Sequence, residues 1–171
     1  MDYAFYKKLY EPHAAFFRKR AWAVKTLRFL NYALTGGIAA AYFAFLIYLS
    51  AIGAWYEIAL CAIIPFACLL AVTLLRSVFN RPRPYAKGGA GITPLFCKWH
   101  KSDKSFPSRH LAAATVIGIV SLPYLPILGI AVLICGALLS YIRFAAGLHY
   151  PTDLLAGMGI GALFGALLFL F

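Results

Sequence analysis

The residues of this chain that are best suited to catalysis fall at the ends of its apolar stretches. They occupy four short segments, namely Arg76 with Arg83-Pro84, Pro107-Ser108-Arg109-His110, Arg143, and His149 with Asp153. Guanidinium groups bind phosphate oxygens in pairs, and an imidazole that is steered by a carboxylate can act as a nucleophile. The set therefore predicts a site that holds a phosphoryl group and attacks it.

His149 and Asp153 are four residues apart in the sequence. If a helix begins near Pro151, both side chains fall on one face, and the carboxylate can accept a hydrogen bond from one imidazole nitrogen. The other nitrogen then keeps its lone pair as a nucleophile. Such a pair alone is more often a simple hydrogen bond at a helix start, so the interpretation depends on the neighbouring segments.

Ser108 and His110 begin the next candidate helix. Ser108 directly precedes an apolar stretch and is predicted to be its N-cap, where backbone N–H groups and the positive helix end favour an anion. His110 falls within the first turn and is suited to protonate a departing alkoxide. The arginines would offset the charge on the phosphate oxygens, so this chemistry needs neither a nucleotide-binding loop nor a metal set.

The elements that position these residues are predicted to be membrane helices. Of the 171 residues, 63% are hydrophobic, and the mean hydropathy is +0.81, which exceeds what a soluble core needs. Five apolar stretches follow one another: Phe29 to about Ile52, about Trp55 to Leu75, His110 to a turn at Pro123 and Pro126, that turn to about Phe144, and Pro151 to Phe171. The predicted fold class is all-α, an integral membrane helical bundle with about five transmembrane helices.

Residues 1–28 differ from the rest because they mix aromatic and basic side chains. We predict that they form an amphipathic helix in the plane of the lipid headgroups, broken near Pro12; a solvated basic tail is the alternative. The chain would then consist of an interfacial segment, residues 1–28, and a single transmembrane domain, residues 29–171.

Alternate threading of the five spans places the four candidate segments, residues 1–28 and all 16 Lys and Arg residues at one membrane face. The opposite face has only Glu57 as a charged residue. Ionisable groups inside a membrane protein are costly to desolvate, so a cluster from separate segments predicts a functional site. Snorkelling of side chains to lipid headgroups explains the basic residues, but it does not explain two histidines, a serine and an aspartate.

The glycines and cysteines are assigned structural roles. Gly157, Gly161 and Gly165 repeat every four residues, a spacing that lets another helix approach closely, either within the monomer or in a homodimer. Of the four cysteines, three lie in apolar runs (Cys61, Cys68 and Cys135) and Cys97 lies in a polar loop. They form neither a disulfide pattern nor a metal-binding pattern, so we expect buried, small apolar residues.

In their order and spacing, the candidate segments resemble the three signatures of the type-2 phosphatidic acid phosphatase superfamily, also called lipid phosphate phosphatases. These signatures are a Lys six residues before Arg-Pro, then Pro-Ser-Gly-His, then Ser-Arg followed by His and Asp. Here their places are taken by Arg76 ahead of Arg83-Pro84, by Pro107-Ser108-Arg109-His110, and by Arg143, His149 and Asp153. All three occur in order within residues 76–153, and the chain is similar to small bacterial members.

The resemblance implies a role for each residue. His149 would form a phosphohistidine intermediate, Asp153 would orient it, and His110 would protonate the leaving group. The phosphate-binding residues would be Arg76, Arg83, Ser108, Arg109 and Arg143. Members of the family work without a metal, so the resemblance implies no metal site and no cofactor.

This chain departs from the family pattern at three positions. Arg76 replaces Lys, which keeps the charge and adds a planar fork, so the geometry changes more than the binding. Arg109 replaces Gly, which implies that the backbone there does not require a conformation reserved for glycine. Ile142 replaces the Ser before Arg143 and removes one possible oxygen contact.

The sequence therefore predicts a membrane phosphatase that hydrolyses a lipid phosphomonoester or pyrophosphate, such as phosphatidic acid, phosphatidylglycerol phosphate or a polyprenyl diphosphate. Two alternatives remain open, namely phosphoryl transfer to another acceptor and a non-catalytic binder or transporter of phospholipid headgroups. The expected partners are the lipid phosphate and membrane lipids. Nucleic acid is not expected, because the net charge of +11 is concentrated at the membrane interface without a recognition module.

Two arguments disagree on which membrane face carries the site of this multi-pass protein. The count of Lys and Arg favours the cytoplasmic face, whereas the resemblance favours the outer face. Several of the charges are assigned to phosphate, which weakens the count. We therefore expect a site at the outer face of the cell membrane, with the cytoplasmic face as the alternative.

Overall fold

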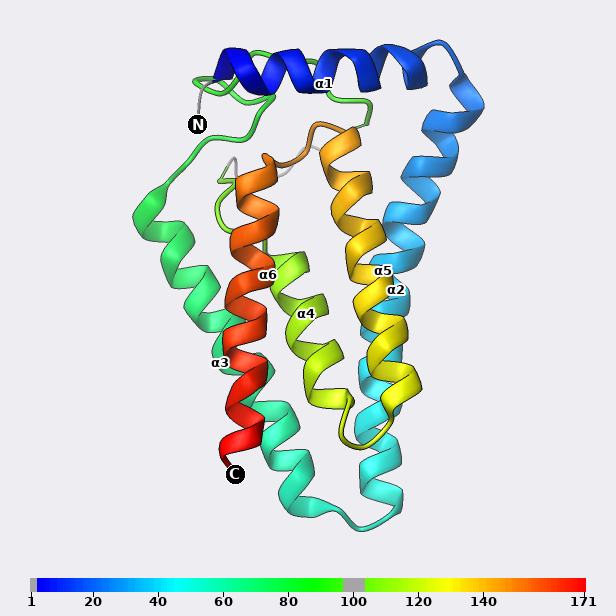
Figure 1. Ribbon diagram of the computed structural model, residues 1–171, viewed down its shortest axis with the longest axis vertical. Helices are drawn as coiled ribbons and strands as arrows, with labels where there is room; N and C mark the ends of the chain where they lie inside the picture. Colours follow the sequence, from blue (N-terminus) through cyan, green and yellow to red (C-terminus); the bar gives the residue numbers. More distant parts are fainter. Residues whose placement is uncertain (1–2, 97–103) are drawn as a thin grey trace.

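The computed structural model describes residues 3–96 and 104–171. Within them the chain forms six α-helices and a C-terminal 3-10 helix, in the order α1 Tyr3–Arg18, α2 Ala21–Ala51, α3 Trp55–Phe79, α4 Arg109–Ser121, α5 Pro126–Ala145, α6 Pro151–Ala166 and η1 Leu167–Leu170. Figure 1 shows α2 to α6 as an upright bundle with α1 lying across its upper end. The predicted all-α fold class is confirmed.

Four of these elements are long and apolar enough to cross a membrane: α2, α3, α5, and α6 together with η1. The remaining bundle helix, α4, has 13 residues, so at about 1.5 Å per residue it is shorter than the hydrocarbon core of about 30 Å. Most of the residues of α4 are buried among the other helices. The structure thus supports four long apolar helices, whereas the sequence predicted about five spans.

The N-terminal helix α1 runs without interruption from Tyr3 to Arg18, with Pro12 inside it. The predicted break near Pro12 is therefore wrong. A proline inside a helix loses one hydrogen bond, but Tyr6, Tyr10 and Ala14 are buried on one face of α1 and pack in a cluster with Ile92. This apolar contact offsets the cost of the proline.

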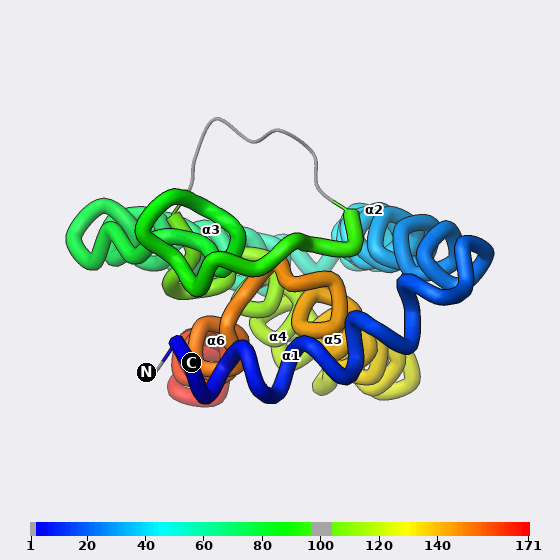
Figure 2. Tube along the Cα trace, turned by 90° about the horizontal axis from the view of Figure 1, so that it is seen from above, coloured from blue at the N-terminus to red at the C-terminus, as the bar shows by residue number. Residues whose placement is uncertain are grey.

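The chain turns between α1 and α2, and α2 begins at Ala21. The first predicted span, from Phe29, is therefore the continuation of a helix that starts earlier, and the basic residues before Phe29 extend it. Seen from above in Figure 2, α1 crosses over the ends of α5 and α6. The N-terminal helix thus covers the end of the bundle at which the candidate segments lie.

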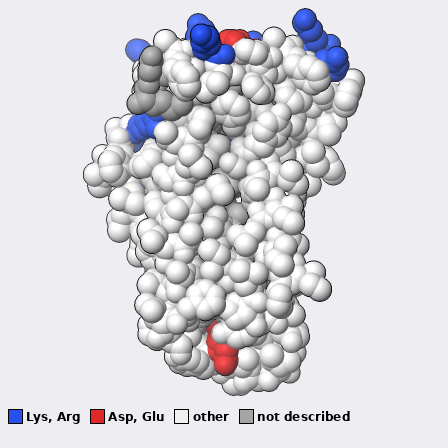
Figure 3. All heavy atoms as spheres, viewed as in Figure 1, with Lys and Arg blue, Asp and Glu red and all other residues white. Residues whose placement is uncertain are grey.

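The helix ends that carry the candidate residues meet at one end of the bundle. In Figure 1, α3 and α5 end toward the upper side and α6 begins there, while α4 begins lower, among the longer helices, with its first turn facing the same side. Figure 3 shows Lys and Arg atoms gathered at that end, above a wide band without charged atoms. For the described residues, this is the arrangement that alternate threading predicts.

The cysteines lie mostly in the interior. Cys61 and Cys68 are buried free thiols in the main apolar core, and Cys135 is partly buried against that core. The prediction of small apolar roles is confirmed for the two buried thiols, and it holds in part for Cys135. Cys97 lies outside the described residues.

The three glycines of α6 form the contact with α4. A Cβ at Gly157 would lie 2.5 Å from the Ser108 carbonyl oxygen, and a Cβ at Gly161 would lie 2.6 Å from the Ala112 oxygen. At Gly165 the nearest atoms belong to the Ile119 side chain, at 2.8 Å. The glycine face is used within the monomer, so α4 already occupies the surface on which a homodimer through these glycines would form.

This packing predicts a contrast between two neighbouring glycines. We expect Gly161→Ala to lower the free energy of unfolding by about 1–3 kcal/mol, because the added methyl group meets a backbone oxygen that cannot move independently. Gly159 has no atom within 4 Å of an added Cβ, so Gly159→Ala should be neutral, or stabilising by up to about 1 kcal/mol. Unfolding in mixed micelles measures both, and equal losses at the two positions would contradict the contact.

Candidate active site

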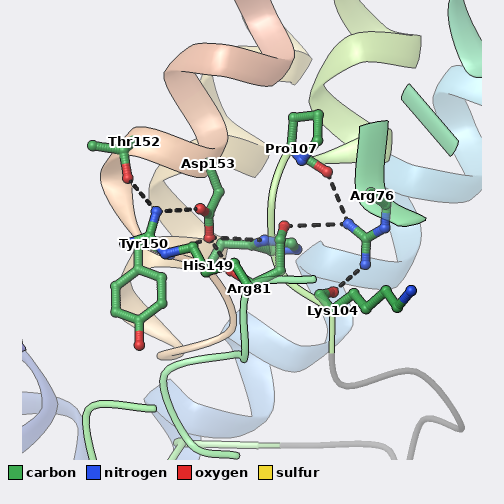
Figure 4. Close-up of polar contacts among 9 residues, drawn as sticks. Arg76, Arg81, Lys104, Pro107, His149, Tyr150, Thr152 and Asp153 are labelled. Carbon is green, nitrogen blue, oxygen red and sulfur yellow. Dashed lines mark hydrogen bonds and ion pairs between the residues drawn. The ribbon is translucent and has the colours of Figure 1, made fainter. Parts of the chain in front are cut away.

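The side chain of Asp153 is fully buried at the start of α6. Its Oδ1 accepts a hydrogen bond from Nη1 of Arg81 at 2.9 Å. Its Oδ2 accepts hydrogen bonds from the hydroxyl of Ser105 and, at 3.0 Å, from the backbone N–H of Tyr150. Pro151 occupies the first turn of α6, as its sequence position predicts. Figure 4 shows Arg81 and Tyr150 beside this carboxylate.

His149 lies next to this carboxylate, with its Nδ1 3.6 Å from Oδ2 of Asp153. The two side chains meet at the predicted spacing, although this distance is longer than a closed hydrogen bond, as is often found at sites without a ligand. Burial and the charges of Arg83 and Arg143 outweigh the opposing effect of Asp153 and lower the pKa of His149 to about 4. The imidazole is therefore neutral at pH 7, with one nitrogen unprotonated.

Ser108 occupies the N-cap position of α4, as predicted. Its backbone N–H donates to the carbonyl oxygen of Asp153 at 2.9 Å. Its hydroxyl does not cap the helix and is buried without a hydrogen-bond partner. The first N–H groups of a helix also lack intrahelical acceptors. The start of α4 therefore presents donors to the site.

Arg109 and His110 open α4 directly after Ser108. Arg109 has an exposed side chain and a helical backbone, so no glycine is needed at its position. His110 is largely enclosed, and burial together with the charges of Arg143, His149, Arg109 and Arg83 lowers its pKa to about 2. His110 is therefore neutral at pH 7, first because it is buried and second because its charged neighbours are cations.

Arg83 and Arg143 are buried beside the two histidines. Arg83 follows α3, whereas Arg143 belongs to the last turn of α5. The Nε atoms of both are buried without a hydrogen-bond partner. The structure thus brings Arg83, Arg143, His110 and His149 together from four segments. In the part of the chain that the structure describes, no group of three or more His, Cys, Asp and Glu is arranged to hold a metal ion.

Arg76 lies in the last turn of α3 and directs its guanidinium group at the backbone. Its Nη1 donates to the carbonyl oxygens of Ser105 at 3.2 Å and Pro107 at 2.8 Å, and its Nη2 donates to that of Lys104. These bonds use three of the five N–H groups of an arginine. Arg76 therefore holds the loop before α4 in place, and it has fewer N–H groups for phosphate than the sequence-based prediction assumes.

Arg81 and Ser105 are part of the site although the sequence-based interpretation missed them. Arg81 reaches Asp153 because Asn80 ends α3 in a left-handed conformation, with φ 40°, and turns the chain back. Asparagine tolerates that conformation well. Two features of the sequence point to this segment, namely the asparagine after an apolar helix and the doubled Arg-Pro dipeptide in residues 81–84.

The sequence and the fold have known counterparts. A family model described as the PAP2 superfamily matches residues 55–171. A lipid A 1-phosphatase from Rhizobium etli is 32% identical over 124 residues, which cover 71% of this chain and 50% of that protein. The undecaprenyl-diphosphatase BcrC of Bacillus subtilis is 33% identical over 99 residues, covering 57% of this chain and 49% of that protein. The chain thus spans about half the length of the curated relatives it matches.

Two crystal structures share the fold. LpxE from Aquifex aeolicus superposes with a TM-score of 0.60 at 24% identity, covering 86% of this chain and 94% of that one. A PAP2 type phosphatidylglycerolphosphate phosphatase from Bacillus subtilis gives a TM-score of 0.57 at 22% identity, covering 96% and 92%. At these sequence identities, the similarity establishes a shared arrangement of the helices and nothing further.

The environment of His149 predicts an unusually low proton affinity that can be measured without any substrate. With its pKa at about 4, the ring should stay neutral from pH 8 to pH 5, where an ordinary histidine titrates near 6.5. Replacing Arg83 by Gln removes a nearby cation, so the pKa should rise. Nitrogen NMR of ¹⁵N-histidine-labelled protein in micelles measures both, with the signal assigned by His149→Gln. A midpoint near 6.5 in the unsubstituted protein would contradict the buried environment.

Proposed function

This chain belongs to the PAP2 superfamily, and on that basis we propose that it is an integral-membrane phosphatase of lipid phosphomonoesters or pyrophosphates. The observation that carries the proposal is a set of buried donors without partners, on segments that meet beside the two histidines. Arg83 Nε, Arg143 Nε and the Ser108 hydroxyl are all buried without partners. Buried unpaired donors cost free energy, and a phosphate group with its several acceptor oxygens would satisfy all three.

The first chemical step is an attack by His149. Its unprotonated imidazole nitrogen forms a bond to phosphorus, and the bond from phosphorus to the lipid oxygen breaks. His110 donates a proton to that departing oxygen. His110 is neutral in the empty site, so we assign its protonation to the arrival of the negatively charged phosphate among the arginines. The products of this step are the dephosphorylated lipid and a phosphohistidine.

The second step is hydrolysis of this intermediate. Neutral His110 accepts a proton from water, the water oxygen forms a bond to phosphorus, and the bond to His149 breaks. His149 is neutral again when this bond breaks, and His110 releases the proton that it took from water as orthophosphate leaves, so both imidazoles return to their starting states. In both steps Arg83, Arg143, Ser108 and the first backbone N–H groups of α4, beginning at Arg109, stabilise the charge on the phosphate oxygens. Arg76 contributes its charge and fixes the loop before α4.

The substrate is proposed to be a phosphorylated membrane lipid. The site lies at the ends of apolar helices, so the lipid tail can stay in the bilayer while the phosphate reaches His149. Phosphatidic acid, phosphatidylglycerol phosphate and a polyprenyl diphosphate are the candidates. The names of the two curated relatives support a lipid-linked phosphate or diphosphate and add lipid A 1-phosphate to that set.

The function proposed for His149 predicts a selective loss of activity. We expect His149→Gln to lower phosphate release from a panel of these lipids by at least about a thousand-fold. The matched control is His13→Gln, because His13 is exposed on α1, where it contacts the Leu9 carbonyl oxygen and lies edge-on against the Phe144 ring without an ionic partner among the described residues. Phosphate release by detergent-solubilised protein is the measurement.

Two additional measurements on the same proteins distinguish a phosphatase from a headgroup binder and from a phosphotransferase. Lipid binding without phosphate release in the unsubstituted protein would identify a headgroup binder. Phosphate that appears on an added alcohol acceptor, in place of orthophosphate, would identify a phosphotransferase. An acid-labile, base-stable phosphate on the unsubstituted protein, absent from His149→Gln, is expected for the phosphohistidine.

We further propose that α1, with the rest of residues 1–28, lies in the headgroup layer of the outer membrane face and that the transmembrane domain follows it. α1 crosses the charged end of the bundle, where its Lys7 and Lys8 are exposed. This placement predicts that a cysteine introduced at the exposed position Lys87, in a Cys97→Ser background, reacts with a membrane-impermeant maleimide in intact cells. Labelling only after the cells are opened would place the site in the cytoplasm.

A further inference from the structure

We propose that Arg81 is a positioning residue of the reaction, which acts by fixing the carboxylate of Asp153 so that Oδ2 faces His149. This inference rests on the phosphatase function proposed above. It assigns a role to an arginine that stands outside the residues expected to bind phosphate or to react. The argument comes from the contacts of Arg81, from the burial of its partner, and from the position of both relative to the imidazole.

The contacts of Arg81 determine how the carboxylate is turned. Nη1 of Arg81 bonds to Oδ1 of Asp153 at 2.9 Å and to Oγ1 of Thr152 at 2.8 Å (Figure 4). With Oδ1 held in this way, Oδ2 is the oxygen left for Ser105, the backbone N–H of Tyr150 and the ring of His149. A rotation of the carboxylate out of its present plane would weaken all of these contacts at once.

The burial of Asp153 explains why a cation is needed. The carboxylate has no solvent exposure, and an unpaired buried charge is costly. The Arg81 side chain is 20% exposed and lines a surface groove of about 460 Å³ together with Tyr3, Phe79 and Phe106. Part of the Arg81 side chain therefore remains accessible to water, so this pair costs less to desolvate than two fully buried ions would.

A third contact fixes the plane of the guanidinium group. Its central carbon lies 4.1 Å from the ring centroid of Tyr150, a cation–π distance. Tyr3 of α1 stacks on the same tyrosine, with 5.7 Å between the ring centroids. Tyr150 directly follows His149, so Arg81 contacts both the side chain next to the nucleophile and the carboxylate that faces it. A lysine would keep the charge but lose this planar contact.

Arg81 differs from the other arginines of the site in how it acts on the His149 ring. The charges with a direct effect on the His149 ring are those of Arg83, Arg143 and Asp153. Arg83 and Arg143 have buried Nε atoms without partners, whereas Nη1 of Arg81 is already engaged by two oxygen atoms. Arg81 therefore acts on the imidazole through the carboxylate, and it is not required as a ligand of the phosphate.

The kinetic test compares Arg81→Met and Arg81→Lys with Arg28→Met, which removes an exposed arginine of α2 at the same end of the protein. For Arg81→Met we expect kcat to fall by about ten- to a hundred-fold, as when other orienting groups are removed, with KM changed by less than about two-fold. Arg81→Lys should recover part of kcat, and Arg28→Met should match the unsubstituted protein. A large rise in KM at unchanged kcat would show that Arg81 binds substrate, and would overturn the proposal.

A double-mutant cycle tests whether Arg81 acts through Asp153. Once Asp153→Asn has removed the charged partner, adding Arg81→Met should change kcat by less than about two-fold. Losses that multiply in the double variant would show that Arg81 acts independently of the carboxylate. All variants are compared by their thermal unfolding midpoints in the same detergent, so that a folding defect is recognised as such.

A measurement on the imidazole separates failure of this inference from failure of the phosphatase function. In ¹⁵N-histidine-labelled protein, the His149 ring should carry its proton on Nδ1, the nitrogen that faces Asp153. We expect Arg81→Met to shift the tautomer population toward a proton on Nε2, and Arg28→Met to leave it unchanged. An identical tautomer population in Arg81→Met would overturn the positioning role, whether or not any lipid is hydrolysed.

Discussion

The site depends on the burial of one carboxylate. Asp153 is removed from water, so its charge requires partners that other segments must supply. Arg81 comes from the chain after α3, Ser105 from the loop before α4, and the Tyr150 N–H from the turn between α5 and α6. The carbonyl oxygen of the same residue accepts the N–H of Ser108. One residue thus joins the segments that carry the proposed nucleophile, the proposed proton donor and the proposed phosphate ligands.

Close helix packing makes this junction possible. Ser108 can bond to Asp153 only if the start of α4 lies against the start of α6, and Gly157 permits that approach because its missing side chain leaves room for the Ser108 carbonyl. Gly161 and Gly165 continue the contact along the helix. Because α4 is short, it starts and ends among the longer helices. The small residues of α6 are therefore part of the architecture of the site, although they carry no reactive groups.

The site is also defined by an excess of positive charge in an apolar protein. Arg83 and Arg143 are buried near two histidines. Among the ionisable side chains of the described residues, the carboxylate of Asp153 contacts only His149 and Arg81. Such an arrangement is costly when empty, since like charges repel and donors lack acceptors. An anion with several oxygens relieves both costs. Above the site, α1 covers the turn that holds His149 by packing Tyr6 edge-on against Tyr150, with the ring centroids 4.8 Å apart.

The sequence by itself determined the class of the protein and most of the candidate residues. Long uncharged stretches predict membrane helices whatever their packing, and the charges at their ends can only gather where those ends meet. Spacing alone also placed His149 against Asp153, because both belong to one local turn. Local geometry and hydrophobicity are properties of neighbouring residues, and these are directly visible in a sequence.

Contacts between distant segments were decided by the tertiary structure. Arg76 bonds to carbonyl groups about thirty residues further along the chain, whereas Arg81, five residues after it, reaches Asp153. Both are arginines near the end of the same helix, and only the left-handed turn at Asn80 and the path of the loop before α4 separate their roles. The unbroken course of α1 through Pro12 was likewise set by tyrosines that pack against residues far away in the sequence. A linear pattern does not encode which distant partner a long, flexible side chain will meet, because that depends on how all the helices are placed.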